Sequence, residues 1–335
     1  MTFKKFLKNK KKLEAANVKI VDHDACGVGF VASMTGKQKR EVVENGIDAL
    51  KAVWHRGAVD ADGKTGDGAG IHIEFSRDFF KEQINVTGHD VSDDQEICLG
   101  MVFLPRTNYS AQERCRTLLE QELLNNDFYI FGWRQVPVNP KVLGQKANDT
   151  RPEIEQIIFA CEKKLDFQEL ERKLFVIRKK IENQAAKEQL NDFYISSLSS
   201  KSVIYKGMFL AENISDFYPD LMDERFTSRF AIFHQRFSTN TFPSWELAQP
   251  FRIIAHNGEI NTLKGNVNWM KTHEAGMESD LFDNIDDIKP IIKANNSDTA
   301  SLDSAFELLV RGGRDLPIAK MMLIPDAWSK KSKII

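Results

Sequence analysis

Cys26 is the residue whose setting most suggests chemistry. It directly follows a polar, lysine-rich segment with six lysines among its first thirteen residues and little apolar material for a core. If residues 1–25 were removed, Cys26 would carry a free α-amino group, whose ordinary pKa of about 7.7–8.0 suits a general base near neutral pH. A thiol and a base on one residue form an N-terminal nucleophile. The alternative is that Cys26 is the first core residue after a disordered tail.

A second motif, His55-Arg56-Gly57, is followed by the glycine-rich segment 63–70, GKTGDGAG. The Lys-Thr pair among glycines suggests a phosphate loop, but the order G-x-x-x-x-G-K-[ST] and its strand-to-helix context are absent. The sequence therefore argues against nucleotide binding there. On its residues alone, the segment is expected to be a glycine-rich surface loop.

Two further motifs lie in the second half of the chain. Arg236 ends the motif HQR and is expected at the end of a strand, where a guanidinium can bind a carboxylate at two points. Asn257 and Gly258 can present a side-chain amide and a backbone N–H together, the two donors that an oxyanion needs. A plain hairpin turn is the alternative for this Asn-Gly pair. Asp298 precedes an expected helix and could simply be its cap.

Hydrophobic patterning predicts the elements that must position these residues. Apolar residues at spacings of three and four predict a helix around Val43–Trp54, and short apolar runs bounded by turns predict strands. A capping box at Ser110-Ala-Gln-Glu113 predicts a helix start. The expected strands are 26–34, 71–75, 193–198, 203–208, 229–237 and 251–256. The other expected helices are 110–126, 167–188 with its charged face outward, 262–276 and 301–310.

Composition excludes several classes of protein. The 335 residues are 42% hydrophobic and 28% charged, which is ordinary for a globular chain and argues against disorder. A net charge of -2 argues against a nucleic-acid partner. No apolar run reaches the ~18–20 residues that span a bilayer, and no apolar segment follows the lysines as in a secretory signal. We expect one α+β domain behind a basic tail.

The four cysteines show neither a CxxC pair nor metal-ligand spacing, so the sequence predicts no metal site and a reducing compartment, the cytoplasm. Cys98 opens one apolar run and Cys161 closes another. Cys115 lies in an expected helix. All three are expected to be buried packing residues.

Several longer stretches match one family. The most specific are ACGVGFVA at 25–32, HRGA at 55–58 and TGDGAGI at 65–71, and FYISSLSS, YKGM and FYPDL match further on. The longest, at 234–270, is HQRFSTNTFPSWELAQPFRIIAHNGEINTLKGNVNWM. Together they resemble the class II glutamine amidotransferases, which are N-terminal nucleophile hydrolases. The FYPDL and FPSWELAQPF stretches resemble the amidotransferase domain of glutamate synthase, over nearly the whole chain.

The resemblance implies a role for each motif in glutamine hydrolysis. Cys26 resembles the nucleophile that attacks the glutamine amide, and its freed α-amino group would be the base. Asn257 and the N–H of Gly258 resemble the oxyanion hole. The implied organisation is a basic propeptide, 1–25, followed by a type 2 glutamine amidotransferase domain, 26–335.

Substrate-binding roles follow in the same way. Arg236 resembles the ligand of the glutamine α-carboxylate, and Asp298 the partner of its α-ammonium. Arg56 matches the HRG loop that shapes the pocket. Thr299 departs from the serine that is usual beside this aspartate.

The resemblance also implies a four-layer αββα sandwich of two antiparallel sheets. The family's match stops near residues 324–328, so the domain is expected to be truncated at its C-terminus. In the family, ammonia passes to a synthase region that makes glutamate from 2-oxoglutarate with FMN and an iron–sulfur cluster. That region is absent here, so this chain is expected to carry no cofactor. Expected partners are glutamine, the synthase region and a small electron-donating subunit.

Three other hypotheses stay open. The chain could be a catalytically silent fragment of the same domain, or an N-terminal nucleophile hydrolase of another amide. The Arg236 and Asp298 pair, suited to the two charged ends of an amino acid, argues against the second. A papain-like enzyme is the weakest, because no CGSCW-like segment surrounds Cys26. The electron donor of the full enzyme, nicotinamide or ferredoxin, is not fixed by the sequence.

Overall fold

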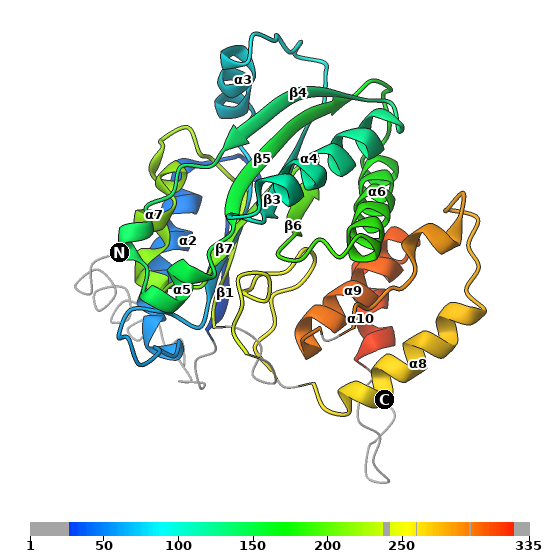
Figure 1. The fold of residues 1–335 in the computed structure, drawn as a ribbon. Coiled ribbons are helices and arrows are strands. Elements are labelled where there is room, and N and C mark those ends of the chain that lie inside the picture. The colour runs from blue at the N-terminus through cyan, green and yellow to red at the C-terminus, as the bar shows by residue number, and fades with distance from the viewer. Residues whose placement is uncertain (1–26, 237–241, 259, 295, 325–335) are drawn as a thin grey trace.

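The computed structural model describes residues 27–236, 242–258, 260–294 and 296–324, which form strands and helices in alternation (Figure 1). The strands are β1 (Val28–Ala32), β2 (Ala69–Glu74), β3 (Ile97–Leu104), β4 (Phe128–Gln135), β5 (Glu153–Cys161), β6 (Tyr194–Ser199), β7 (Ser202–Gly207) and β8 (Phe230–Gln235). The helices are α2 (Arg40–Ala52), α3 (Arg77–Val86), α4 (Tyr109–Leu124), α5 (Gln145–Asp149), α6 (Phe167–Lys187), α7 (Ile214–Phe217), α8 (Leu263–Ala275), α9 (Asp298–Arg311) and α10 (Leu316–Leu323).

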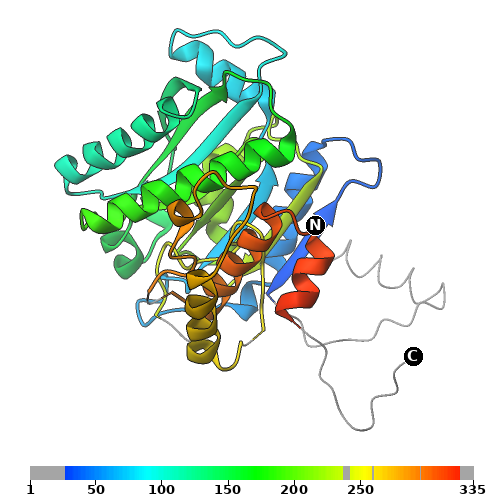
Figure 2. The same ribbon diagram turned by 90° about the vertical axis from the view of Figure 1, so that its right-hand side faces the viewer.

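The described strands form two four-stranded sheets in which every pairing is antiparallel. The first has the order β1-β8-β2-β7 and the second the order β4-β5-β3-β6. Helix α2 packs on the first sheet, while α4 and α6 lie side by side on the second, as the two views in Figures 1 and 2 show.

Strand β3 shows why the sheets form the inner layers. All eight of its residues are buried. Leu99, Met101 and Phe103 join the core that includes the first sheet, whereas the alternate residues Cys98, Val102 and Leu104 join the core beneath α4 and α6. Because successive side chains of a strand point to opposite faces, β3 is covered by a sheet on one side and by helices on the other. The four-layer αββα arrangement confirms the expected fold class.

Helix α6 differs from the expectation that its charged residues face outward. Arg178, Lys179 and Glu182 are buried. Arg178 donates to Glu182 over 2.9 Å and to Glu307 of α9 over 2.5 Å. The expectation is wrong for this part of the helix because α9 covers it and supplies the opposite charge.

The strand expected at 251–256 does not form. The main chain turns there instead, with Phe251 N donating to Ile254 O over 3.0 Å. Asp303 of α9 accepts from the backbone N–H groups of Ile253 and Ile254 over 2.9 and 3.0 Å. A side chain thus supplies the hydrogen bonds that a neighbouring strand would have supplied.

Two helix starts also differ from the expected ones. Helix α4 is capped by Asn108, whose side chain accepts from Ala111 N over 3.1 Å, and not by Ser110. Helix α9 begins three residues before the expected 301, and its cap is Ser297, which accepts from Ala300 N over 3.1 Å. Asp298 is therefore the first residue of the helix and not its cap.

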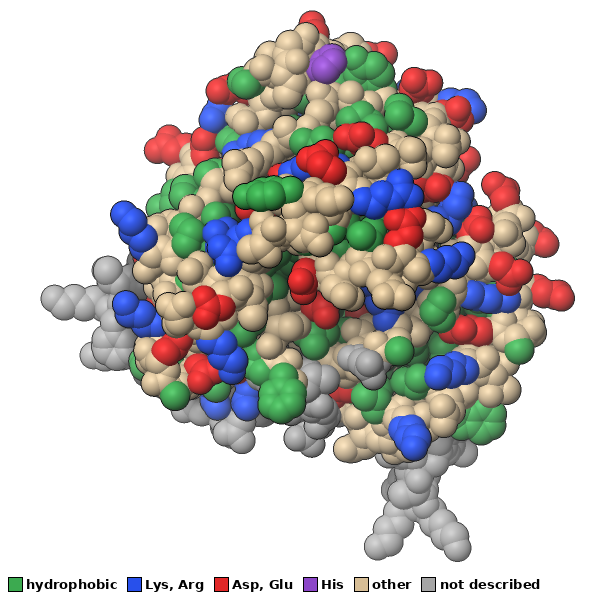
Figure 3. All heavy atoms as spheres, in the orientation of Figure 1, with side chains coloured by type: hydrophobic (Ala, Val, Ile, Leu, Met, Phe, Trp, Pro, Cys, Tyr) green, Lys and Arg blue, Asp and Glu red, His purple; other side chains and the backbone are tan. Residues whose placement is uncertain are grey.

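The surface carries both signs of charge. On the face shown in Figure 3, acidic and basic side chains are intermixed. None of the helices in the described part of the chain combines the length and apolar character needed to cross a membrane.

Gly46 allows α2 to approach the first sheet. A Cβ at this position would lie 2.6 Å from the Cβ of Ala231 in β8. Glycine inside a helix normally costs ~0.5–1 kcal/mol relative to alanine. We nevertheless expect Gly46→Ala to lower the free energy of unfolding by about 1–3 kcal/mol, because the helix must shift. Denaturant unfolding measures this change.

Gly265→Ala in α8 is the matched control. The nearest atom to its new Cβ would be the Thr262 methyl, at 3.0 Å, on an exposed side chain that can rotate. This variant should gain up to ~1 kcal/mol from helix propensity. Equal effects of the two substitutions would contradict the packing argument.

Candidate functional site

The site is built around the end of β8, where it pairs with β1. Gln235 N donates to Gly27 O over 2.6 Å, and a Cβ at Gly27 would lie 2.4 Å from Gln235 O. Position 27 therefore requires glycine. Cys26, the expected nucleophile, is covalently joined to Gly27 but lies outside the described residues.

Arg236 follows β8 in an unusual backbone conformation. Its φ is 97°, a value that costs energy for any residue with a side chain. Arg236 N donates to Gly68 O over 2.7 Å, and its Nε lies 3.5 Å from Asp67 Oδ2. Both its main chain and its side chain are thus held by the glycine-rich segment. The Arg236 side chain remains 46% exposed, so it can meet a ligand.

Buried polar groups without partners gather beside Arg236. Neither oxygen of Asp67 and neither amide atom of Gln235 has a hydrogen-bond partner among the described residues, and the same holds for Arg56 Nε. Gly57 lies close to the side chains of Gln235 and Asp67. A Cβ at this position would lie 1.8 Å from Gln235 Nε2 and 3.3 Å from Asp67 Oδ1. Each such group costs about 1–3 kcal/mol, so the cluster requires an explanation beyond stability.

The electrostatics of Asp67 fit a functional role. Burial raises the pKa of the Asp67 carboxyl to about 6, although the nearby Arg236 guanidinium favours the ionised form. Perturbed carboxyls of this kind cluster at functional sites. The expectation that 63–70 is a surface loop is wrong for most of the segment, since Thr65 to Gly70 are buried.

Asn257 and Gly258 lie in an irregular exposed segment after the turn at 251–254. No strand flanks them within the described residues 242–258, so the hairpin alternative is wrong. The residue before them is held tightly. Gln249 pairs with both the N–H and the carbonyl of His256, each over 3.0 Å, and His234 Nε2 lies 3.1 Å from the same carbonyl.

Asp298, at the start of α9, contacts the chain just after the Asn257-Gly258 pair. It is buried, and its Oδ2 accepts from Ile260 N over 3.3 Å. Its Oδ1 accepts from the backbone N–H of Thr299 over 2.7 Å and from the Thr299 hydroxyl over 3.3 Å. The threonine that departs from the family pattern therefore bonds the carboxylate as a serine hydroxyl could.

These contacts link the segments that carry the expected site residues. Arg236 is two residues from His234, which contacts the main chain beside Asn257, and Asp298 contacts the chain two residues after Gly258. The HRG loop that contains Arg56 packs on the end of β8. Five of the six expected residues thus lie on directly contacting segments, and the sixth is Cys26.

Sequence reasoning missed four residues that support the site: Asp67, Gln235, Gln249 and His234. Their sequence signal was weak but present, because each lies within a quoted match to the family. Their roles depend on burial and on contacts between distant segments, which spacing alone does not reveal.

The three described cysteines are packing residues, as expected. Cys98, Cys115 and Cys161 are buried and unpaired. Burial raises the pKa of the Cys115 thiol to about 11 and that of Cys98 well above its ordinary value, which makes both poor nucleophiles. No group of three or more potential metal ligands occurs among the residues that the structure describes.

Comparison with known proteins agrees with this arrangement. The family model "Glutamine amidotransferases class-II" matches residues 26–335, so the expectation that the match stops near residues 324–328 is wrong. The glutamate synthase [NADPH] large chain of Azospirillum brasilense is 60% identical over 307 residues, which cover 91% of this chain and 20% of that protein. Ferredoxin-dependent glutamate synthase 2 of Synechocystis is 41% identical, and so is the glutamate synthase [NADPH] large chain of Bacillus subtilis; each match covers 93% of this chain.

The chain spans about a fifth of the length of these relatives. The family match, in contrast, extends over the whole described structure and both sheets. The resemblance found in the sequence is thereby confirmed: the chain belongs to the class-II glutamine amidotransferases.

Proposed function

We propose that this chain hydrolyses the side-chain amide of glutamine to glutamate and ammonia. The observation that carries the proposal is the linkage of Arg236, the Asn257-Gly258 segment and Asp298 through direct contacts of their neighbours. A guanidinium and a carboxylate suit the two charged ends of an amino acid, and an amide beside an N–H suits an oxyanion.

Cys26 is proposed as the nucleophile after removal of residues 1–25. Its thiol would lose a proton to its own α-amino group and attack the amide carbon, while Asn257 and Gly258 N–H stabilise the oxyanion. Collapse of that intermediate releases ammonia, which takes the proton from the α-ammonium, and water then hydrolyses the thioester. The start of the family match at Cys26 supports this assignment.

Arg236 is proposed to bind the substrate α-carboxylate, Asp298 its α-ammonium, and Arg56 to shape the pocket. Asp67 is proposed to hold the Arg236 guanidinium in place from behind. Its burial and the 3.5 Å separation support that role.

The remaining functions belong to a longer protein. We propose that the ammonia serves a synthase region that makes glutamate from 2-oxoglutarate, because the relatives are named glutamate synthases. FMN and an iron–sulfur cluster would belong to that region. The 60% identical relative is named for NADPH, which favours a nicotinamide donor and a small electron-donating subunit. The three buried free thiols favour the cytoplasm.

The first prediction tests the nucleophile. Cys26→Ser should lose glutamate release from glutamine almost completely, since a serine hydroxyl is a far weaker nucleophile than a thiol. Cys98→Ser, Cys115→Ser and Cys161→Ser should change thermal stability more than turnover. N-terminal sequencing of the active protein should begin at Cys26, and an active protein that begins at Met1 would refute the proposal. Inactivity of the folded, processed chain would favour the silent-fragment hypothesis.

A second prediction separates binding from catalysis. Arg236→Ala should chiefly raise KM, because its charge holds the substrate in ground and transition states alike. Asp298→Asn should do the same while keeping an oxygen for Ile260 N. Asn257→Ala should lower kcat by roughly 10²–10³, because it removes a donor to developing negative charge. Steady-state kinetics decide, and an effect of Asn257→Ala on KM alone would contradict its role.

Asp67 yields a third prediction. Asp67→Asn should raise KM through Arg236, and the wild-type kcat/KM should fall as pH drops through about 6, where Asp67 takes up a proton. The raised pKa means that the folded state holds this proton more tightly, so ionised Asp67 lowers stability above pH 6. Asp67→Asn should therefore raise Tm at pH 8 more than at pH 5. A lower Tm at both values would show that Asp67 is a structural residue.

A further inference from the structure

The segment that ends in Asn257 has no strand to hold it, yet its main chain is closely paired with side chains. Gln249 is the nearest of these. Its Nε2 donates to His256 O and its Oε1 accepts from His256 N, each over 3.0 Å, as a neighbouring strand would do. Only one orientation of the Gln249 amide satisfies both bonds, so the pairing also fixes that orientation.

The carbonyl of His256 receives a second hydrogen bond. His234 Nε2 lies 3.1 Å from it, and because a carbonyl can only accept, this nitrogen must carry the proton. Burial lowers the pKa of His234 to about 4, so its ring is neutral at neutral pH. Both lone pairs of the carbonyl thus have donors.

This carbonyl matters because of the peptide group to which it belongs. The planar peptide bond places His256 O in one plane with the N and Cα of Asn257. Fixing the oxygen and the N–H of His256 therefore fixes the position of the Asn257 Cα, from which the Asn257 side chain and the chain toward Gly258 begin.

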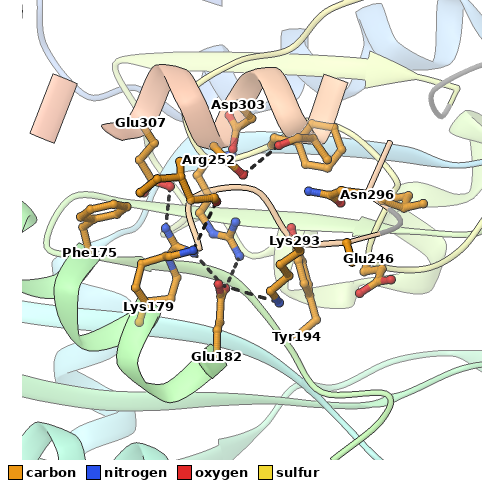
Figure 4. A pocket seen from close by; sticks show the side chains of 17 residues that line it. Phe175, Lys179, Glu182, Tyr194, Glu246, Arg252, Lys293, Asn296, Asp303 and Glu307 are labelled. Carbon is orange, nitrogen blue, oxygen red and sulfur yellow. Dashed lines mark hydrogen bonds and ion pairs between the residues drawn. The ribbon is translucent and has the colours of Figure 1, made fainter. Parts of the chain in front are cut away.

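Gln249 is itself held in place. It is 1% exposed, and its main-chain carbonyl lies against Gly70 of β2, where a Cβ would approach to 2.6 Å. Between Gln249 and His256, Asp303 holds the turn by accepting from Ile253 N and Ile254 N. Figure 4 shows Asp303 and Arg252 beside each other at this turn. Gln249 and His234, which both bond His256, are the last anchors before Asn257.

We propose that Gln249 is a positioning residue for amide hydrolysis, which sets Asn257 and Gly258 in the geometry of an oxyanion hole by pairing with both main-chain polar groups of His256. This inference rests on the proposed glutaminase function. Gln249 does not touch the substrate in this proposal, so its loss should act on kcat and not on substrate binding.

The test compares Gln249→Leu with the wild-type full chain in a glutamate-release assay. Misplacement of an oxyanion donor by about 1 Å can cost up to ~10²-fold, so kcat should fall roughly 10- to 100-fold with KM changed less than about threefold. Gln112→Leu is the matched control. Gln112 is also buried and donates to a main-chain carbonyl, Pro105 O, over 3.1 Å, but it lies in α4 on the second sheet. The Gln112→Leu variant should be less stable than the wild type and keep the wild-type kcat.

Gln249→Glu tests the positioning role through the pH dependence of kcat, which a purely structural role of Gln249 would not change. A buried glutamate has a raised pKa, so at low pH its protonated form can donate to His256 O, whereas the ionised form repels that oxygen. The ratio of its kcat to that of the wild type should therefore rise as pH falls from 8 to 5.5. Dividing by the wild-type value at each pH removes the pH dependence that the wild type itself shows; the ionisable side chains that face this region are those of His234, His256 and Asp303.

The outcomes are distinct. An active wild type with unchanged kcat in Gln249→Leu overturns the inference alone, and so does a Gln249→Glu ratio that does not vary with pH. A selective loss of kcat in Gln249→Glu at pH 8 that is recovered as the pH falls supports the inference, even if Gln249→Leu fails to fold. An inactive but folded and processed wild type overturns the proposed function, and the inference with it.

Discussion

The pairing of β8 with β1 on one side and β2 on the other brings Arg236 and the glycine-rich segment together. His234 lies opposite Val28 in one strand and opposite Gly70 in the other. The start of β1, the end of β8 and the start of β2 therefore lie side by side at one end of the first sheet. Cys26 precedes β1, Arg236 follows β8, and the glycine-rich segment leads into β2. A register shift of one residue would reverse the faces of these side chains and separate the groups.

A second constraint links helix α6, in the layer that covers the second sheet, to helix α9, which carries Asp298. Buried Arg178 of α6 binds both Glu182 and Glu307, and Arg252 approaches Glu182 to 3.2 Å (Figure 4). Burial alone would favour the neutral form of Glu182. Arg178 and the other basic side chains around Glu182 nevertheless hold the pKa of its carboxyl below the ordinary value. Desolvation offsets most of the gain from such pairs, so they add little net stability. Their consequence is geometric, because they fix the helix that carries Asp298 and Asp303.

The accuracy of the sequence analysis follows the range of the interactions concerned. Strand β8 and helix α2 have local patterns, and the structure places both close to their expected bounds. The buried Cys98 and Cys161 were likewise evident from apolar runs. The turn at 251–254 looked like a strand because its apolar residues satisfy that pattern, while the group that prevents pairing, Asp303, lies fifty residues away. The two-sheet sandwich came from the family resemblance, since no local pattern specifies which strands share a sheet.

Polar burial divides the site into two parts with different physical roles. Gln249 and Asp303 are buried with their hydrogen bonds made, so they lower the energy of one conformation of the Asn257 segment. The side chains of Asp67 and Gln235 are buried without hydrogen-bond partners among the described residues, and they raise the energy of the empty site. Groups of the first kind hold catalytic geometry before the substrate arrives. Groups of the second kind gain most when a ligand or a charged side chain meets them, and they lie beside Arg236, on the side proposed to bind the charged end of glutamine. The rigid part of the site is thus the part that must stabilise a short-lived oxyanion, and the strained part is the part where binding can relieve the strain.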